Sequence, residues 1–103
     1  MSMEGLVAVV TGSSRGIGKG IAKIFGKQGA RVAVVARSEE EGGRLPGNIH
    51  LTVKEIQDAG GQATAFRCDV TDEEQVEALA AAVVEAYGRI DVLVNNAGVQ
   101  VNV

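Results

Sequence analysis

The sequence predicts an α/β protein in which the strands of a parallel sheet alternate with helices. Short, continuous apolar runs rich in valine recur along the chain, as expected for strands that are buried on both faces. Between these runs, apolar residues are spaced by three and four positions, which is typical of amphipathic helices. The three aromatic residues are Phe25, Phe66 and Tyr87, so the core must consist mainly of Val, Ile, Leu and Ala.

The first half of the chain predicts two strands around one helix. Residues 6–10 form an apolar strand that ends at Thr11, and residues 31–36 repeat the pattern. Residues 17–28 form the helix between them. Its expected apolar face consists of Ile17, Ile21, Ile24 and Phe25, and a stripe of Lys19, Lys23 and Lys27 predicts a solvated face or, alternatively, an anion patch. Residues 38–48 contain turn signals and predict a loop.

The second half of the chain predicts two more helices and two more strands. Asn48 is a plausible N-cap for a second helix, which Gly60 and Gly61 end, and residues 63–68 form a third strand. Residues 71–74 read as a capping box, so a third helix should start at Asp72. Its apolar face consists of Val76, Leu79, Ala80, Val83 and Tyr87, and residues 90–94 form the fourth strand.

This alternation predicts right-handed crossovers and half of a doubly wound, Rossmann-type sheet with strand order 3-2-1-4. The chain has 103 residues, so we expect residues 1–103 to form one partial domain. Its net charge of −3 disfavours a nucleic-acid binder. The one cysteine, Cys68, excludes an internal disulfide and a zinc cluster, and we expect it in the core of a cytoplasmic protein. The longest apolar run, residues 78–84, is far short of the ~20 residues that span a bilayer.

A glycine-rich segment, TGSSRGIG at residues 11–18, lies between the first strand and the first helix. Glycines in this position allow a tight turn and a close approach of phosphate to the backbone, and the helix start beyond supplies N–H donors. The candidate cofactor residues here are Gly12, Ser13, Ser14, Arg15, Gly16, Ile17 and Gly18. The two serines could bond phosphate or merely cap the turn. A triphosphate-hydrolysing P-loop is disfavoured, because Gly20 stands where Ser or Thr should follow Lys19.

The residues after the second strand indicate which dinucleotide is bound. An acidic residue there would hold the ribose 2′-hydroxyl of NAD or the ribose of S-adenosylmethionine, whereas an arginine accommodates the 2′-phosphate of NADP. This chain has Arg37 and Ser38 at that point, and Arg15 in the loop could approach the same phosphate. The sequence therefore favours NADP(H) over NAD(H), with Arg37 and Ser38 among the cofactor-binding residues.

Three motifs in this order resemble the short-chain dehydrogenase/reductase family. They are residues 11–18, residues 68–70 and residues 95–98. The resemblance implies that Asp69, with Val70 beside it, binds the adenine amino group. It also implies that Asn95, Asn96, Ala97 and Gly98 support the sheet beside the cofactor.

The family's catalytic Ser, Tyr-x-x-x-Lys pair and helix Asn lie beyond its strand-four motif. None can be placed in this chain, since Tyr87 is followed four residues later by Asp91 and not by Lys. We therefore expect the NADP-binding portion of an oxidoreductase that acts on carbonyl or alcohol groups, without its catalytic half and inactive alone. The alternatives are a non-catalytic dinucleotide-binding or assembly module, and a truncated product without independent function.

The predicted half-sheet also suggests a homo-oligomer. The outer edge of the fourth strand has no neighbour within the predicted topology, and one helix alone must cover one whole face of the sheet. We expect a second copy of the chain to bind at that edge or on that face, with no nucleic-acid and no membrane partner.

Overall fold

The computed structural model describes residues 2–13, 16–37 and 48–96. Strands and helices alternate through these residues: β1 (Val7–Thr11), α1 (Gly16–Lys27), β2 (Arg31–Ala36), α2 (Ile49–Asp58), β3 (Gln62–Arg67), α3 (Glu73–Tyr87) and β4 (Val92–Val94). The strands form one parallel sheet in the order β3-β2-β1-β4. This confirms the predicted fold class and strand order.

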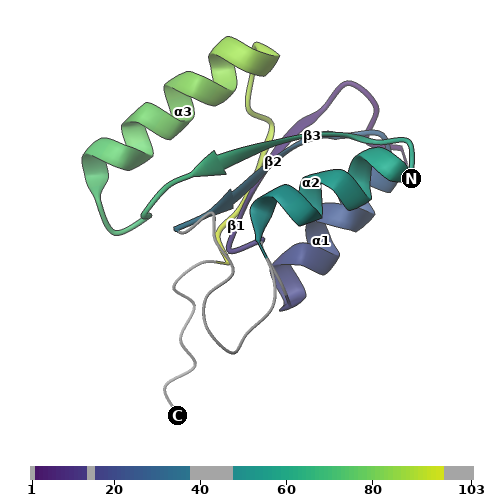
Figure 1. Ribbon diagram of the computed structural model, residues 1–103. Helices are drawn as coiled ribbons and strands as arrows, with labels where there is room; N and C mark the ends of the chain where they lie inside the picture. Colours follow the sequence, from purple (N-terminus) through teal and green to yellow (C-terminus); the bar gives the residue numbers. More distant parts are fainter. Residues whose placement is uncertain (1, 14–15, 38–47, 97–103) are drawn as a thin grey trace.

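The sheet separates two layers of helices, with α1 and α2 on one side and α3 on the other (Figure 1). Successive residues of a strand point to opposite faces, so the two central strands supply both cores. Ala8 and Val10 of β1 belong to the core under α1 and α2, whereas Val7 and Val9 belong to the core under α3. Strands that are apolar at every position are therefore required at the centre of this sheet.

The buried face of α1 agrees with the prediction in part, since Ile21 and Phe25 are half-buried and pack against the core. Ile17 is 77% exposed and Ile24 is 60% exposed, whereas the buried residues of the helix are Gly18, Ala22 and Gly26. A Cβ atom at Gly26 would lie 2.7 Å from Cγ2 of Ile56 in α2. The closest approach of α1 to its neighbours is therefore made by its smallest residues, and a larger side chain has no space at Gly18 or Gly26.

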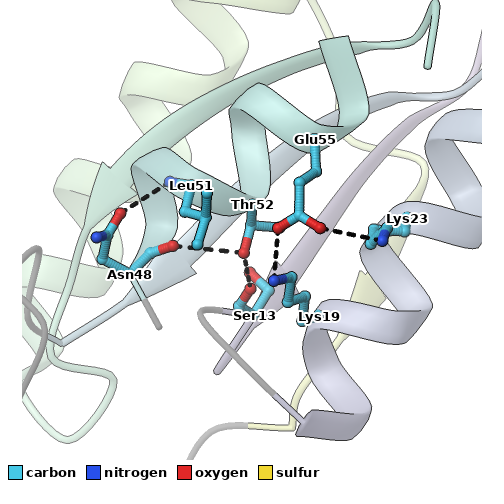
Figure 2. A network of polar contacts seen from close by, with 7 residues as sticks. All are labelled: Ser13, Lys19, Lys23, Asn48, Leu51, Thr52 and Glu55. Carbon is cyan, nitrogen blue, oxygen red and sulfur yellow. Dashed lines mark hydrogen bonds and ion pairs between the residues drawn. The ribbon is translucent and has the colours of Figure 1, made fainter. Parts of the chain in front are cut away.

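The lysine stripe of α1 is partly used to join the two helices on this side of the sheet. Nζ of Lys19 lies 2.5 Å from Oε2 of Glu55 in α2, and Nζ of Lys23 lies 3.2 Å from Oε1 (Figure 2). Hydrogen bonds from Lys19 and then Lys23 hold the pKa of Glu55 below its usual value. Two of the three lysines are therefore ion-paired within the protein, so they are neither a purely solvated face nor an open anion patch.

The start of α3 is displaced by one residue from the prediction. Asp72 is the N-cap and lies outside the helix, and its Oδ1 accepts hydrogen bonds from the N–H groups of Glu74 (3.0 Å) and Gln75 (3.3 Å). Nε2 of Gln75 donates back to Oδ2 of Asp72 at 3.1 Å. The reciprocal capping pair is thus Asp72 with Gln75, because Asp is as good an N-cap as Thr.

Only part of the predicted apolar face of α3 is covered. Val83 is buried and Leu79 and Tyr87 are half-buried, but Val76 and Ala80 are exposed. The hydroxyl of Tyr87 lies 2.5 Å from Oγ1 of Thr64 in β3. α3 therefore packs toward β3, and it leaves the face of β4 largely open.

β4 is shorter than the predicted 90–94 because Asp91 is engaged in a different way. Its N–H donates to the carbonyl of Val7 (2.9 Å), and its carboxylate Oδ2 accepts the N–H of Val7 (2.8 Å). The Asp91 carboxylate thus accepts a hydrogen bond that a backbone carbonyl would accept in a regular ladder. Regular pairing of β4 with β1 therefore begins at Val92. Leu93, in the middle of β4, is 66% exposed.

Among the described residues, no helix combines the length and the apolar composition that crossing a membrane requires. The same residues contain no group of three or more His, Cys, Asp or Glu residues that could hold a metal ion. Cys68 is buried, as predicted, and burial raises the pKa of its thiol.

The packing of α1 predicts opposite effects for two glycine-to-alanine substitutions. Gly26→Ala forces Ile56 to move and should lower the free energy of unfolding by about 1–3 kcal/mol. Gly20→Ala, on the exposed side of the same helix with no atom within 4 Å of the new methyl group, should raise it by about 0.5–1 kcal/mol. Urea unfolding measures both values. Equal stabilities for the two variants would contradict the close-packed interface between α1 and α2.

Candidate functional site

The predicted site residues that the structure describes lie where the four parallel strands end. They are Gly12, Ser13, Gly16, Ile17, Gly18, Arg37, Asp69, Val70, Asn95 and Asn96, whereas Ser14, Arg15, Ser38, Ala97 and Gly98 lie outside the described residues. Because the carboxyl ends of parallel strands share one edge, the segments that follow β1, β2, β3 and β4 all lie there. This edge is where open α/β sheets bind their ligands.

The glycine loop has a backbone that larger residues rarely adopt. Gly12 has a φ of 66° and Gly16 a φ of 62°, both in the left-handed region. Gly18 is required for a different reason, since a Cβ atom there would lie 2.2 Å from the carbonyl oxygen of Gly12 and 2.7 Å from Nδ2 of Asn96. The first turn of α1 is therefore in direct contact with the loop. Its N–H donors and the positive end of its dipole are placed beside the loop, as an anion site requires.

Ser13 is directed into the protein. It is fully buried, and its Oγ donates to the carbonyl of Val10 (2.7 Å) and accepts the N–H of Val35 (2.9 Å). Its own N–H donates to the carbonyl of Val35 at 3.0 Å. These contacts favour the turn-capping alternative for Ser13, because its polar groups join the ends of β1 and β2.

Thr52 of α2 supports the glycine loop through a hydrogen bond to its backbone. The sequence motifs did not indicate this role. Thr52 is fully buried, and its Oγ1 donates to the carbonyl of Ser13 at 2.9 Å (Figure 2). Asn48 caps the same helix by accepting the N–H of Leu51 at 2.8 Å, as predicted. The available signal was a polar residue between Ile49 and Ile56 on the buried face of the helix, where a hydroxyl needs a partner.

Thr11 joins the loop to the end of β4. Its Oγ1 accepts the N–H of Asn96 (3.0 Å) and lies 3.1 Å from Oδ1 of Asn95. Nδ2 of Asn96 donates to the carbonyl of Gly12 at 3.3 Å. The asparagine pair therefore contacts the end of β1 and the glycine loop. Thr11 itself is a further positioning residue, and its place at the end of an otherwise apolar strand was the signal for it.

Charged side chains lie at the ends of β2 and β3. Arg37 is exposed, and Nε of Arg67 donates to the Arg37 carbonyl oxygen at 3.2 Å. Oδ1 of Asp69 accepts hydrogen bonds from both Oγ1 (2.6 Å) and N–H (3.0 Å) of Thr71. These bonds, together with the charge of Arg37, hold the pKa of Asp69 below its usual value. Asp69 is therefore a carboxylate at neutral pH and can accept hydrogen bonds from a ligand.

The arrangement as a whole suits a dinucleotide. A glycine turn against a helix start can receive a diphosphate, an arginine follows β2, and a half-buried carboxylate follows β3. A family model described as "short chain dehydrogenase" matches residues 6–103.

The chain belongs to the short-chain dehydrogenase family.

Its relatives and structural neighbours agree with this assignment. The chain is 43% identical over 99 residues to 3beta-hydroxysteroid dehydrogenase 1 of Eggerthella lenta, covering 96% of this chain and 36% of that protein. A short-chain dehydrogenase from Mycobacterium thermoresistibile superposes with a TM-score of 0.91 at 46% identity, over 98% of this chain and 36% of that one. A metagenomic short-chain oxidoreductase in complex with NADP gives a TM-score of 0.85 at 46% identity, over 96% of this chain and 42% of that one.

The chain thus spans well under half the length of these short-chain dehydrogenases. Its matched part carries the glycine loop, and members of the family bind NAD or NADP.

The support that Thr52 gives to the glycine loop predicts a loss of stability in one variant. Thr52→Val keeps the shape of the side chain but leaves the buried carbonyl of Ser13 without this donor, so the free energy of unfolding should fall by about 1–3 kcal/mol. Thr52→Ser keeps the hydroxyl, so its free energy of unfolding should fall by less than that of the valine variant. Urea unfolding of the parent and both variants compares them. A valine variant as stable as the parent would show that the hydrogen bond does not support the loop.

Proposed function

We propose that residues 1–103 are the NADP(H)-binding portion of an oxidoreductase that transfers hydride between a nicotinamide and a carbonyl or alcohol group. The observation that carries the cofactor preference is Arg37, which stands at the end of β2 where an NAD-binding site would have an acidic residue. A guanidinium can bind a phosphate through two parallel hydrogen bonds. The NADP complex of one structural neighbour supports the same preference.

Each strand end contributes to the proposed binding of the cofactor. The diphosphate would lie on the backbone of Gly12, Gly16, Ile17 and Gly18, with Ser13 shaping that loop from beneath and Ser14 and Arg15 completing it. Arg37 and Ser38 would take the 2′-phosphate, Asp69 and Val70 the adenine, and Asn95, Asn96, Ala97 and Gly98 would support the strand beside the cofactor. When bound, the nicotinamide supplies the hydride chemistry, and this portion supplies position.

A non-catalytic dinucleotide-binding module is the second candidate, and the environment of Tyr87 favours it. This tyrosine bonds Thr64 near the start of β3, and the guanidinium of Arg31, the first residue of β2, lies 5.3 Å from its ring centroid. Tyr87 therefore lies at the amino edge of the sheet, opposite the cofactor edge. It cannot serve as a proton donor there, so none of the described residues is assigned a catalytic role.

The proposed cofactor preference predicts the effect of reversing one charge. The parent chain should bind NADP(H) more tightly than NAD(H), and Arg37→Asp should narrow or reverse that preference. The variant loses the charge pairing with the 2′-phosphate and gains an acceptor for a ribose hydroxyl. Calorimetric titration with the oxidised and reduced forms of both cofactors measures the four affinities. Equal affinities of the parent chain for the two cofactors would refute the NADP assignment.

We also propose that the chain self-associates, through the open edge of β4 or the sheet face beside it. In the part of the chain that the structure describes, β4 pairs only with β1, and an unpaired strand edge is a template for another chain. Leu93 on this strand and Val84 on α3 are exposed apolar side chains on the α3 side of the molecule. A second copy that buries them would also complete the sheet.

Self-association predicts a mass that depends on concentration. Light scattering over a dilution series should show species larger than 10.6 kDa, and Leu93→Lys should shift the population toward the monomer, because a charge opposes burial of this edge. Leu51→Lys is the control, since Leu51 is an exposed apolar residue on α2 at a distance from β4. A parent chain that stays at 10.6 kDa at every concentration would contradict self-association.

A further inference from the structure

Arg67 makes a contact that links it to the proposed cofactor site. It is the last residue of β3 and is in register with Ala36 of β2, so it lies beside the point where the chain leaves β2. Its Nε donates to the carbonyl oxygen of Arg37 at 3.2 Å, and both arginines are exposed. No motif identified in the sequence includes Arg67.

This hydrogen bond fixes the backbone from which the Arg37 side chain emerges. Arg37 follows the last residue of β2, so it has no partner in the regular ladder beyond Ala36. The hydrogen bond from Arg67 gives the Arg37 carbonyl a partner on the neighbouring strand. A guanidinium has five N–H donors, and the bond to Arg37 uses the one on Nε. The donors on the two Nη atoms therefore remain at the same edge of the sheet.

Two cations at neighbouring strand ends favour a dianion over an uncharged group. Arg37 and Arg67 lie at the ends of β2 and β3. The carboxylates that follow β3 accept hydrogen bonds within the protein, Asp69 from Thr71 and Asp72 from the first turn of α3. A phosphate monoester carries about −1.5 to −2 charges at pH 7, so each arginine strengthens its binding. A ribose hydroxyl is uncharged, so a second arginine adds little to its binding. A second arginine thus adds to the discrimination between the two dinucleotides.

We propose that Arg67 is a second determinant of the preference for a 2′-phosphate, because it positions Arg37 through its carbonyl and adds a cation to the same site. This inference rests on the proposed function, since it assumes that the edge beyond β2 receives the adenosine ribose.

The test compares two ligands that differ only in the 2′-phosphate, adenosine 2′,5′-bisphosphate and adenosine 5′-monophosphate, by calorimetry on the full chain. Arg67→Gln should lower the affinity for the bisphosphate by about tenfold, the size expected when one charged hydrogen-bond donor is lost, and should leave the affinity for the monophosphate nearly unchanged. The bisphosphate affinity of this variant should also depend less on salt concentration than that of the parent.

Two further variants separate the roles of Arg67. Arg67→Lys keeps the charge but not the planar Nε donor, so it should lose affinity for the bisphosphate to an intermediate extent. Lys27→Gln removes an equal charge from the exposed last turn of α1, at the opposite edge of the sheet, and should change neither affinity. Thermal unfolding of each variant confirms that the fold is intact.

The outcomes distinguish this inference from the proposed function. If the parent chain does not prefer the bisphosphate, or Arg37→Asp leaves that preference intact, the NADP assignment itself fails. If the parent prefers the bisphosphate and Arg37→Asp removes the preference, but Arg67→Gln behaves like Lys27→Gln, only the role of Arg67 is overturned.

Discussion

The contact between Gly18 and the carbonyl of Gly12 is the constraint on which the rest of the site depends. No side chain fits between them, because a Cβ atom on Gly18 would lie 2.2 Å from that oxygen. The first turn of α1 can therefore approach the end of β1 closely enough for its N–H donors to border the loop. The same close approach continues along the helix at Gly26, where Ile56 of α2 occupies the space that a larger residue would need. One helix thus aligns the loop, the sheet and α2 through a stripe of small residues.

Two hydroxyl groups hold the loop from opposite sides. Thr52 donates to the carbonyl of Ser13 from α2, and Thr11 accepts the N–H of Asn96 from the end of β4. Ser13 in turn bonds the backbones of both β1 and β2. A loop of glycines has little shape of its own, since each glycine loses more conformational freedom on folding than other residues do. Its shape is therefore determined by neighbours from three other elements, and preorganisation of this kind is what a phosphate-binding backbone needs.

The sequence predicted the order of the strands and the place of the loop, because these depend on local patterns. Continuous apolar runs indicate central parallel strands, and the glycine spacing between a strand and a helix indicates an anion site. The buried face of α1 was predicted only in part. Ile21 and Phe25 pack against the core, but Ile17 and Ile24 are exposed, because the most closely packed positions of the helix hold Gly18, Ala22 and Gly26. Thr52 was missed because its partner Ser13 is 39 residues away, and such a contact depends on the packing of α2. Asp91 shortened β4 for a similar reason, as its carboxylate bonds a residue at the other end of the chain.

The distribution of charge explains how an acidic chain can present a site for an anion. The net charge of −3 describes the molecule at long range, and it disfavours polyanions such as nucleic acids. At the carboxyl edge of the sheet, Arg37 and Arg67 lie at neighbouring strand ends, whereas the carboxylates of Asp69 and Asp72 accept hydrogen bonds from Thr71 and from the first turn of α3. Two of the lysines on α1 do not contribute to that edge, because Glu55 pairs with both of them. Charges over ~8 Å apart in water are largely screened from one another at physiological ionic strength, so a small anion responds to this local arrangement more than to the total. The proposed preference of the edge for a small phosphate over an extended polyanion would follow from where the cations are placed.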